Sequence, residues 1–222
     1  MTDSKKPEVA LEPRQDDGEK LFSPSAGRNR EAIADVLAEH LPQGARVLEI
    51  GSGTGEHAAT LLERRPDVTW QPSDPDGRSR LSQKAWSQDV KGRMAKPWPL
   101  NLTFPHWNEG LGRFDALVCV NVIHIAPLKV MHELAARADQ LVEPGGLVYL
   151  YGPYLEGDAT APSNLAFDVS LKERDPDWGV RPLGDVAKAF DTGGFPHMTR
   201  IDMPANNLSL VFKRDEASHA SS

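Results

Sequence analysis

The stretch Arg46-Val47-Leu48-Glu49-Ile50-Gly51-Ser52-Gly53-Thr54-Gly55 decides the fold of this chain, because an apolar segment leads directly into a glycine-rich loop. Residues 46–50 predict a short strand, and the residues after the loop predict a helix that carries Ala58, Leu61 and Leu62. Glycine permits the tight turn between the two elements and lets backbone N–H groups approach a ligand closely. The helix N-terminus adds the positive end of its dipole. The stretch therefore predicts a ligand-binding turn between a strand and a helix.

Two phosphate-binding patterns do not fit this loop. A dinucleotide fingerprint, G-x-G-x-x-G, needs glycine where this chain has Glu56, and a carboxylate at a helix N-terminus would repel a pyrophosphate. A phosphate loop needs Gly-Lys-Ser/Thr, which does not occur here. A glycine-rich turn without any ligand remains as an alternative, although Glu49 inside an apolar strand then needs another partner.

An acidic residue follows the second predicted strand, residues 68–71. Asp74 comes 21 positions after Gly53, and an acid about 20 residues after the glycines is where nucleotide-binding sheets hold ribose hydroxyls. An ionised carboxylate suits this task because it accepts hydrogen bonds and donates none. The alternative is a simple turn, since Asp74-Pro75-Asp76-Gly77 consists of turn-forming residues.

Strand-like and helix-like segments alternate along the rest of the chain. A helix begins at Ser23-Pro24, where a capping serine precedes proline, and Pro42-Gln43-Gly44 ends it. Residues 114–122 form a near-continuous apolar run, typical of a central parallel strand. Further strands are predicted at 99–103, 147–151, 197–203 and 208–213, and further helices at 78–90, 128–142, 163–174 and 182–190. The alternation predicts an α/β fold with a Rossmann-like, seven-stranded, mostly parallel sheet, a C-terminal antiparallel hairpin and helices on both faces.

Composition narrows the function classes. The 222 residues suffice for one domain, and 39% hydrophobic and 26% charged residues are ordinary for a globular protein. The net charge of −7 disfavours nucleic acid as a partner. The single cysteine, Cys119, excludes an internal disulfide framework and a cysteine-built zinc site, and we predict no metal. Because Cys119 lies within an apolar run, we expect it to be a core residue.

The ends of the chain differ from its middle. No apolar run approaches 18 residues, and the first 20 residues lack the apolar stretch of a secretory signal, so we expect a cytoplasmic protein without membrane association. The polar composition predicts disordered tails at residues 1–21 and 215–222. Residues 22–214 are expected to form the folded domain.

Several blocks of residues, in a fixed order, resemble a known family. The pattern E-x-G-x-G-x-G of residues 49–55 is similar to the first motif of class I S-adenosylmethionine-dependent methyltransferases. From about Phe22 to Arg214, the chain more specifically resembles the methyltransferase-like family known as domain of unknown function 938. The blocks are SP (23–24), RNRE (28–31), LEIGSGTGEH (48–57), PSD (72–74), CVNVIHI (119–125), PL (127–128), YGPY (151–154), SN (163–164), FD (167–168), DWG (177–179), Arg181 and DMPANN (202–207).

The resemblance implies S-adenosylmethionine as cofactor and assigns residues to it. Asn121, at the end of the fourth strand, would lie near the point of methyl transfer. The family has a Leu-Asp-Val block after the third strand, where this chain has Leu102-Thr103-Phe104, so Thr103 would replace an aspartate at the adenine. The expected cofactor-binding residues are Arg28, Asn29, Glu49, Gly51, Ser52, Gly53, Gly55, His57, Asp74, Thr103 and Asn121.

The acceptor side is expected where the fourth and fifth strands end. His124 follows the fourth strand and could act on a ligand, or bond the backbone as an ordinary loop histidine. We predict catalytic roles for Asn121, His124 and Tyr154. Tyrosine combines an apolar wall with a hydroxyl tip, and the helix at 163–174 lies where this superfamily commonly covers the acceptor. The expected substrate-binding residues are Tyr151, Tyr154, Asn164, Asp168 and Trp178.

Three functions are compatible with these residues. The leading hypothesis is a methyltransferase that acts on a small-molecule acceptor, mainly by proximity and orientation. The second is a protein or nucleic-acid methyltransferase, and the net charge of −7 argues against the nucleic-acid acceptor. The third is a non-catalytic cofactor-binding protein on the same fold. We expect a monomer or homodimer.

Overall fold

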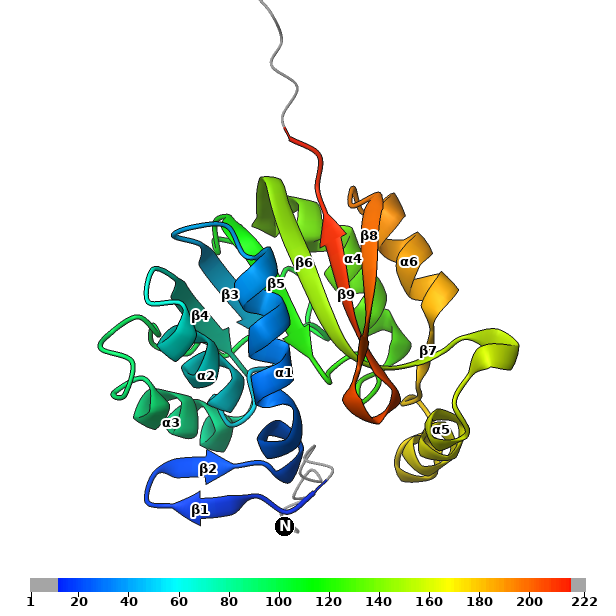
Figure 1. The fold of residues 1–222 in the computed structure, drawn as a ribbon, viewed down its shortest axis with the longest axis horizontal. Helices are drawn as coiled ribbons and strands as arrows, with labels where there is room; N and C mark the ends of the chain where they lie inside the picture. Colours follow the sequence, from blue (N-terminus) through cyan, green and yellow to red (C-terminus); the bar gives the residue numbers. More distant parts are fainter. Residues whose placement is uncertain (1–11, 217–222) are drawn as a thin grey trace, which may run out of the picture.

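A seven-stranded sheet with helices on both faces forms the centre of the molecule (Figure 1). The computed structural model describes residues 12–216. The order is β4-β3-β5-β6-β9-β8, and β7 pairs with the end of β6. β4, β3, β5 and β6 are parallel, whereas β9 is antiparallel to both neighbours. The strands are β3 (Arg46–Ile50), β4 (Thr69–Ser73), β5 (Phe114–Val120), β6 (Val142–Leu155), β7 (Arg181–Pro182), β8 (His197–Met203) and β9 (Asn207–Lys213).

Within residues 12–216, six α-helices connect or flank these strands. The helices are α1 (Pro24–His40), α2 (Glu56–Arg64), α3 (Gly77–Trp86), α4 (Leu128–Leu141), α5 (Pro162–Arg174) and α6 (Leu183–Thr192), and two short 3₁₀ turns follow β6 and β8. The α1 helix begins as predicted, because the Ser23 side chain accepts a hydrogen bond from the Ala26 N–H at 3.5 Å and Pro24 takes the first helical position. The predicted fold class is confirmed.

Two apolar layers form the core, one on each face of the sheet. Alternate residues of β5 divide between them, since side chains along a strand point to opposite faces. Val118 packs in the layer with Leu37 of α1 and Leu61 of α2. Leu117 and Cys119 pack in the layer with α4 and α6. Cys119 is 2% exposed, so its prediction as a core residue is confirmed.

The predicted strand at 99–103 is wrong. The chain runs beside β4 slightly earlier, where Met94 and Trp98 form isolated parallel bridges with Trp70 and Ser73. Prolines at positions 97 and 99 lack the N–H that a continuous ladder needs, so the contact remains two bridges. The short β7 strand completes the count of seven instead.

The N-terminal tail prediction is also wrong for residues 15–21. β1 (Gln15–Asp17) and β2 (Lys20–Phe22) form an antiparallel hairpin next to α3, seen at the lower left of Figure 1. Leu21 is 3% exposed, its N–H donates to Ser82 Oγ at 2.8 Å, and Phe22 packs edge-on against Trp86. These two apolar side chains anchor an otherwise polar segment. Residues 1–11 and 217–222 lie outside the described residues.

The length and the apolar character of each helix decide whether it could span a lipid bilayer. Among residues 12–216, no helix is long and apolar enough to cross a membrane.

Candidate active site

The glycine loop between β3 and α2 has a backbone that glycine makes possible. Gly51, Gly53 and Gly55 have φ angles of 67°, 54° and 94°, in the left-handed region that residues with a Cβ rarely adopt. A Cβ at Gly51 would lie 2.6 Å from a methyl carbon of Val122, so the loop packs directly against the residues after β5. Ser52 fastens the loop to β4, because its N–H donates to Ser73 O at 2.8 Å.

Asp74 joins the glycine loop to the end of β4. Its Oδ2 accepts the Gly53 N–H at 2.9 Å, and its Oδ1 accepts the Asp76 N–H at 2.9 Å. Asp74 is 8% exposed, and burial raises its pKa, while these two N–H groups oppose the rise. Each carboxylate oxygen has lone pairs beyond the one it uses here, so both can accept further hydrogen bonds. The spacing argument therefore placed the acid beside the loop correctly.

Glu49 lies under the glycine loop and is 1% exposed. Its Oε2 accepts the Trp70 indole N–H at 2.9 Å. Burial, with a smaller contribution from the charge of Asp74, raises the pKa of Glu49 to about 7, although hydrogen bonds from Ser52 and Trp70 oppose this rise. Trp70 is thus the partner that a carboxyl group within an apolar strand required.

Glu56, which replaces the glycine of a dinucleotide fingerprint, connects the loop to α1. Its Oε2 accepts the Ser23 N–H at 2.7 Å and the Thr54 hydroxyl at 2.8 Å. Its Oε1 accepts from Arg30 at 3.2 Å, and the side chain is 2% exposed. Glu56 is therefore a buried structural carboxylate that holds the start of α1 against the loop.

Asn29 and His57 meet between α1 and α2. His57 Nε2 donates to Asn29 Oδ1 at 2.9 Å, and Asn29 also hydrogen-bonds Tyr151, which counters a rise in the Tyr151 pKa caused by burial. Burial, assisted by the charge of Arg30, lowers the pKa of His57 to about 4. The three side chains therefore form one polar group next to the loop, with a neutral imidazole.

This depressed pKa predicts an acid-sensitive contribution to stability. The imidazole is neutral in the folded protein, so its contribution is present above pH 6.5 and is lost as pH falls toward about 4. Between pH 7 and pH 5, urea unfolding should show wild type losing about 1 kcal/mol more than His57→Gln, an effect reduced because His57 is only half-buried. Parallel losses in the two proteins would contradict the prediction.

Arg28 extends away from this group. Its Nη2 donates to both carboxylate oxygens of Glu12 at 3.0 Å, and its side chain is 64% exposed. The charge of Arg28 still lowers the pKa of Tyr151, so the guanidinium is not remote from the site. Of the two predicted cofactor residues on α1, Arg28 and Asn29, Arg28 is the one that binds the N-terminal segment.

Asn121 and His124 lie where β5 ends. Asn121 has a φ of 57°, and its N–H donates to Tyr151 O at 2.9 Å. His124 is 2% exposed, and its Nδ1 has no hydrogen-bond partner among residues 12–216. A Cβ at Gly152 would lie 3.0 Å from His124 Cε1, so glycine there makes room for the imidazole. Burial, assisted by the charge of Arg181, lowers the pKa of His124 to about 3.

The other predicted acceptor residues have mixed surroundings. Tyr154 is 1% exposed, and its hydroxyl lacks a hydrogen-bond partner within the described part of the chain. Asn164 donates to Tyr154 O at 3.2 Å and Asn206 O at 2.9 Å. Asp168 accepts the Val180 N–H at 2.9 Å and pairs with Lys172. Asn164 and Asp168 thus already hydrogen-bond other parts of the protein, and these contacts stabilise the fold.

Trp178 and Thr103 lie in irregular segments. Trp178 is half-buried in the turn that follows α5. Thr103 is exposed, and its hydroxyl donates to Asn101 Oδ1 at 2.8 Å. The structure therefore places Thr103 in an exposed turn, and the third strand that was expected to precede it is absent at residues 99–103.

Sequence reasoning missed two arginines. Arg181 is 8% exposed, and its Nε donates to Ile123 O at 2.9 Å, so it supports the segment that carries His124. Its place among the family blocks was the available signal. Arg14 Nη1 donates to Ser79 Oγ at 2.9 Å, and its Nη2 lies 3.9 Å from the position of a Cβ on Gly53. No signal marked Arg14, because it occurs in a polar run.

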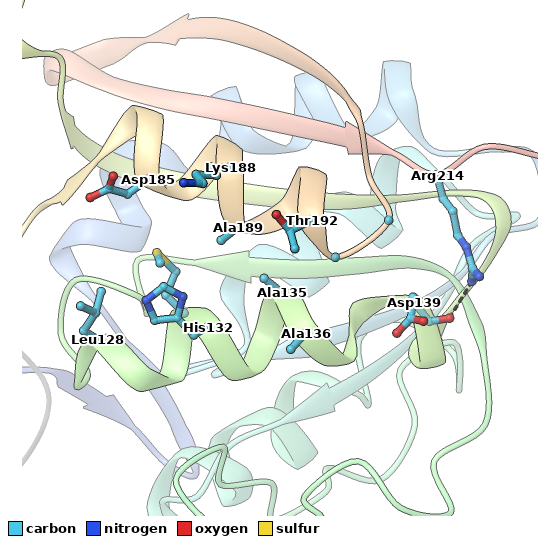
Figure 2. A pocket seen from close by; sticks show the side chains of 13 residues that line it. Leu128, His132, Ala135, Ala136, Asp139, Asp185, Lys188, Ala189, Thr192 and Arg214 are labelled. Carbon is cyan, nitrogen blue, oxygen red and sulfur yellow. Dashed lines mark hydrogen bonds between the residues drawn. The ribbon is translucent and has the colours of Figure 1, made fainter.

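A groove of about 780 Å³ lies elsewhere, between α4 and α6 (Figure 2). His132, Ala135 and Lys188 are among its lining residues, and Arg214 closes one end by donating to Asp139 O at 2.6 Å. None of the predicted site residues lines it. The polar side chains of the candidate site lie instead at the carboxyl ends of β3, β4, β5 and β6, where parallel α/β sheets usually bind ligands.

Comparison with sequence families assigns most of the chain. Residues 20–214 match the family described as "Protein of unknown function (DUF938)". The chain belongs to this family. A curated relative, the demethylmenaquinone methyltransferase of Deinococcus radiodurans, is 33% identical over 115 residues, which are 50% of this DUF938 chain and 44% of the relative. This chain therefore covers less than half of that relative's length.

Solved methyltransferases share the fold of this DUF938 protein. An O-methyltransferase family protein from Burkholderia thailandensis superposes with a TM-score of 0.75 at 20% identity, covering 87% of this chain and 57% of that one. Human N-acetylserotonin methyltransferase, in complex with S-adenosylmethionine, gives 0.71 at 12% identity, covering 86% and 53%. A calicheamicin-biosynthesis methyltransferase in its S-adenosylhomocysteine-bound form gives 0.69 at 15% identity, covering 87% and 54%. The predicted methyltransferase fold is confirmed.

Proposed function

We propose that this protein is an S-adenosylmethionine-dependent methyltransferase that acts on a small-molecule acceptor. The observation that carries the proposal is the unit formed by the glycine loop and Asp74, joined by the 2.9 Å hydrogen bond from the Gly53 N–H to Oδ2. This unit combines a close backbone approach with a carboxylate that has free lone pairs. The resemblance to methyltransferases in sequence and fold supports the same assignment.

The residues present fit the proposed cofactor. Apart from the chain neighbours Ser52 and Thr54, only Arg14 among the described residues comes within 4 Å of a Cβ placed on Gly53, so that side of the loop leaves room for a ligand. Asp74 would accept ribose hydroxyls, while Asn29 and His57 line the α1 side. The set proposed to hold the cofactor comprises Arg28, Asn29, Glu49, Gly51, Ser52, Gly53, Gly55, His57, Asp74, Thr103 and Asn121, of which Arg28 and Thr103 are exposed.

The chain's own contribution to transfer would be orientation of the acceptor. When bound, S-adenosylmethionine supplies an electrophilic methyl group on a sulfonium centre. Alignment of an acceptor with such a group can lower a barrier by several kcal/mol without covalent help from the protein. Burial keeps the imidazole of His124 neutral, and a pKa of about 3 makes it a weak base. Its Nδ1, which has no hydrogen-bond partner among the described residues, is therefore proposed to hydrogen-bond the acceptor rather than to remove a proton from it. Asn121 and Tyr154 are proposed to orient the acceptor.

Charge and relatives favour a small acceptor. A net charge of −7 opposes binding to the phosphate backbone of nucleic acid. The names of two similar proteins, demethylmenaquinone methyltransferase and N-acetylserotonin methyltransferase, point to small molecules as their acceptors. We further propose that the protein works in the cytoplasm, as a monomer or homodimer.

Isothermal titration of the folded protein with S-adenosylhomocysteine should show saturable binding of one ligand per chain. Methyl-labelled S-adenosylmethionine incubated with lysate and protein should then place label in the small-molecule fraction. The absence of binding would contradict the proposed function. Label in protein or nucleic acid would favour a macromolecular acceptor, and binding without turnover over a broad acceptor panel would favour a non-catalytic cofactor-binding protein.

A further inference from the structure

The N-terminal strap, residues 12–22, crosses the edge of the sheet where the candidate site lies. Its hairpin lies beside α3 and the start of α1 in Figure 1. Asp16 pairs with Arg78 of α3, whose Nη2 lies 2.7 Å from both carboxylate oxygens, and Lys20 pairs with Asp89. The buried Leu21 anchors the inner end of the strap. The strap is therefore attached independently of Arg14.

Arg14 brings a cation from the strap to the glycine loop. Its side chain is only 15% exposed, and Nη1 lies 2.9 Å from Ser79 Oγ and 4.0 Å from Asp76 Oδ2. Its Nη2 comes to 3.9 Å from the Cβ position of Gly53, whose N–H binds Asp74. The guanidinium thus lies at the junction of strap, loop and α3.

The charges around Asp74 explain why a cation belongs there. Asp76, on the same turn, and Glu49, on β3, place two further carboxyl groups nearby. Arg80 of α3 donates to the backbone oxygens of Asp74 and Pro75. Burial raises the pKa of Asp74, and the charge of Arg14 lowers it, together with the N–H groups of Gly53 and Asp76. The charge of Arg14 therefore favours the ionised form of Asp74.

We propose that Arg14 is a positioning residue of the cofactor site: the strap holds its guanidinium against the loop, where it orders the Asp74 and Asp76 carboxylates and forms the outer wall of the ribose pocket. This inference rests on the proposed function for the identity of the ligand. It extends the site to a segment that precedes all the motifs of the chain.

A ligand-free titration tests the electrostatic half of the proposal. The ¹⁵N shift of the Gly53 amide reports ionisation of Asp74, because that N–H donates to Oδ2, and the Trp70 indole N–H reports Glu49 separately. Arg14→Gln should move the Gly53 titration midpoint to higher pH, and Arg14→Lys should restore most of the wild-type value. Arg78→Gln, which removes only a surface pair of the strap, should leave the midpoint unchanged. Coincident curves for wild type and Arg14→Gln would overturn the proposal.

Isothermal titration with S-adenosylhomocysteine tests the binding half. Arg14→Gln should bind about tenfold more weakly near neutral pH, and the difference should grow at lower pH as Asp74 is protonated. Arg78→Gln should bind within about twofold of wild type, which shows that loss of a strap contact alone is insufficient. Equal affinities for wild type and Arg14→Gln would overturn the inference. Failure of wild type to bind would instead contradict the proposed function, and the ligand-free titration would still decide whether Arg14 acts on Asp74.

Discussion

Replacing Asp74 with asparagine should weaken binding of S-adenosylhomocysteine by about 100-fold. The amide can still accept the Gly53 N–H, but its NH₂ group would then face the Asp76 N–H, a donor that now binds Oδ1 at 2.9 Å. The substitution also removes the charge that strengthens hydrogen bonds from ribose hydroxyls. Two such bonds at about 1.5 kcal/mol each account for a loss of this size. Isothermal titration measures it directly.

Asp76→Asn is the matched control for this experiment. Asp76 caps α3, because its Oδ2 accepts the Ser79 N–H at 2.7 Å, and asparagine is an equally good capping residue. The control removes one negative charge two residues from Asp74 and leaves the proposed ribose contact intact. We expect its affinity to remain within about threefold of wild type. If Asp76→Asn lost binding while Asp74→Asn retained it, the proposed ribose role would belong to Asp76 and not to Asp74.

The parts of the fold that sequence predicted are those in which local and long-range signals agree. Residues 46–50 include Val47, Leu48 and Ile50, end before glycine and precede an amphipathic helix, and β3 has those bounds. The segment at 99–103 lacked such agreement, because Pro97 precedes it and Pro99 begins it. The hairpin of the strap was missed because Leu21 and Phe22 are the only apolar residues of segment 15–22, and their partners on α3 lie more than 60 residues away.

The candidate site was predictable where it depends on strand order and less so where it depends on side-chain partners. Parallel strands bring Glu49, Asp74, Asn121 and Tyr151 to one edge, as the alternating pattern implied. Nothing in the sequence indicated that Asn164 and Asp168 would hydrogen-bond the backbone of the protein itself. The position of a polar residue in the sequence therefore makes it a candidate for ligand binding, and its hydrogen-bond partners in the structure decide whether it is available.

Glu49→Gln should make the protein more stable above neutral pH, by about 3 kcal/mol near pH 8.5. Burial raises the Glu49 pKa from 4.5 to about 7, so the folded state binds this proton more tightly than the unfolded state. The contribution of Glu49 is therefore fully present below pH 4.5 and is lost as pH rises through about 7. Glutamine keeps an oxygen for the Trp70 N–H and carries no charge. Urea unfolding at about pH 5 and 8.5 should show a variant advantage mainly at the higher pH.

Glu56→Gln should have the opposite effect on stability, although Glu56 directly follows the same loop. Glu56 is as buried as Glu49, but it has Arg30 and the Ser23 N–H as partners. Its neutralisation leaves Arg30 without its buried counter-charge and should destabilise the fold by about 2 kcal/mol. Destabilisation of both variants at pH 8.5 would contradict this account of Glu49. We propose a functional reason for this contrast. The Glu49 carboxylate is held without a cationic partner at a cost in stability, and it is therefore suited to bind a cationic ligand. Glu49→Gln should accordingly weaken cofactor binding while it stabilises the fold.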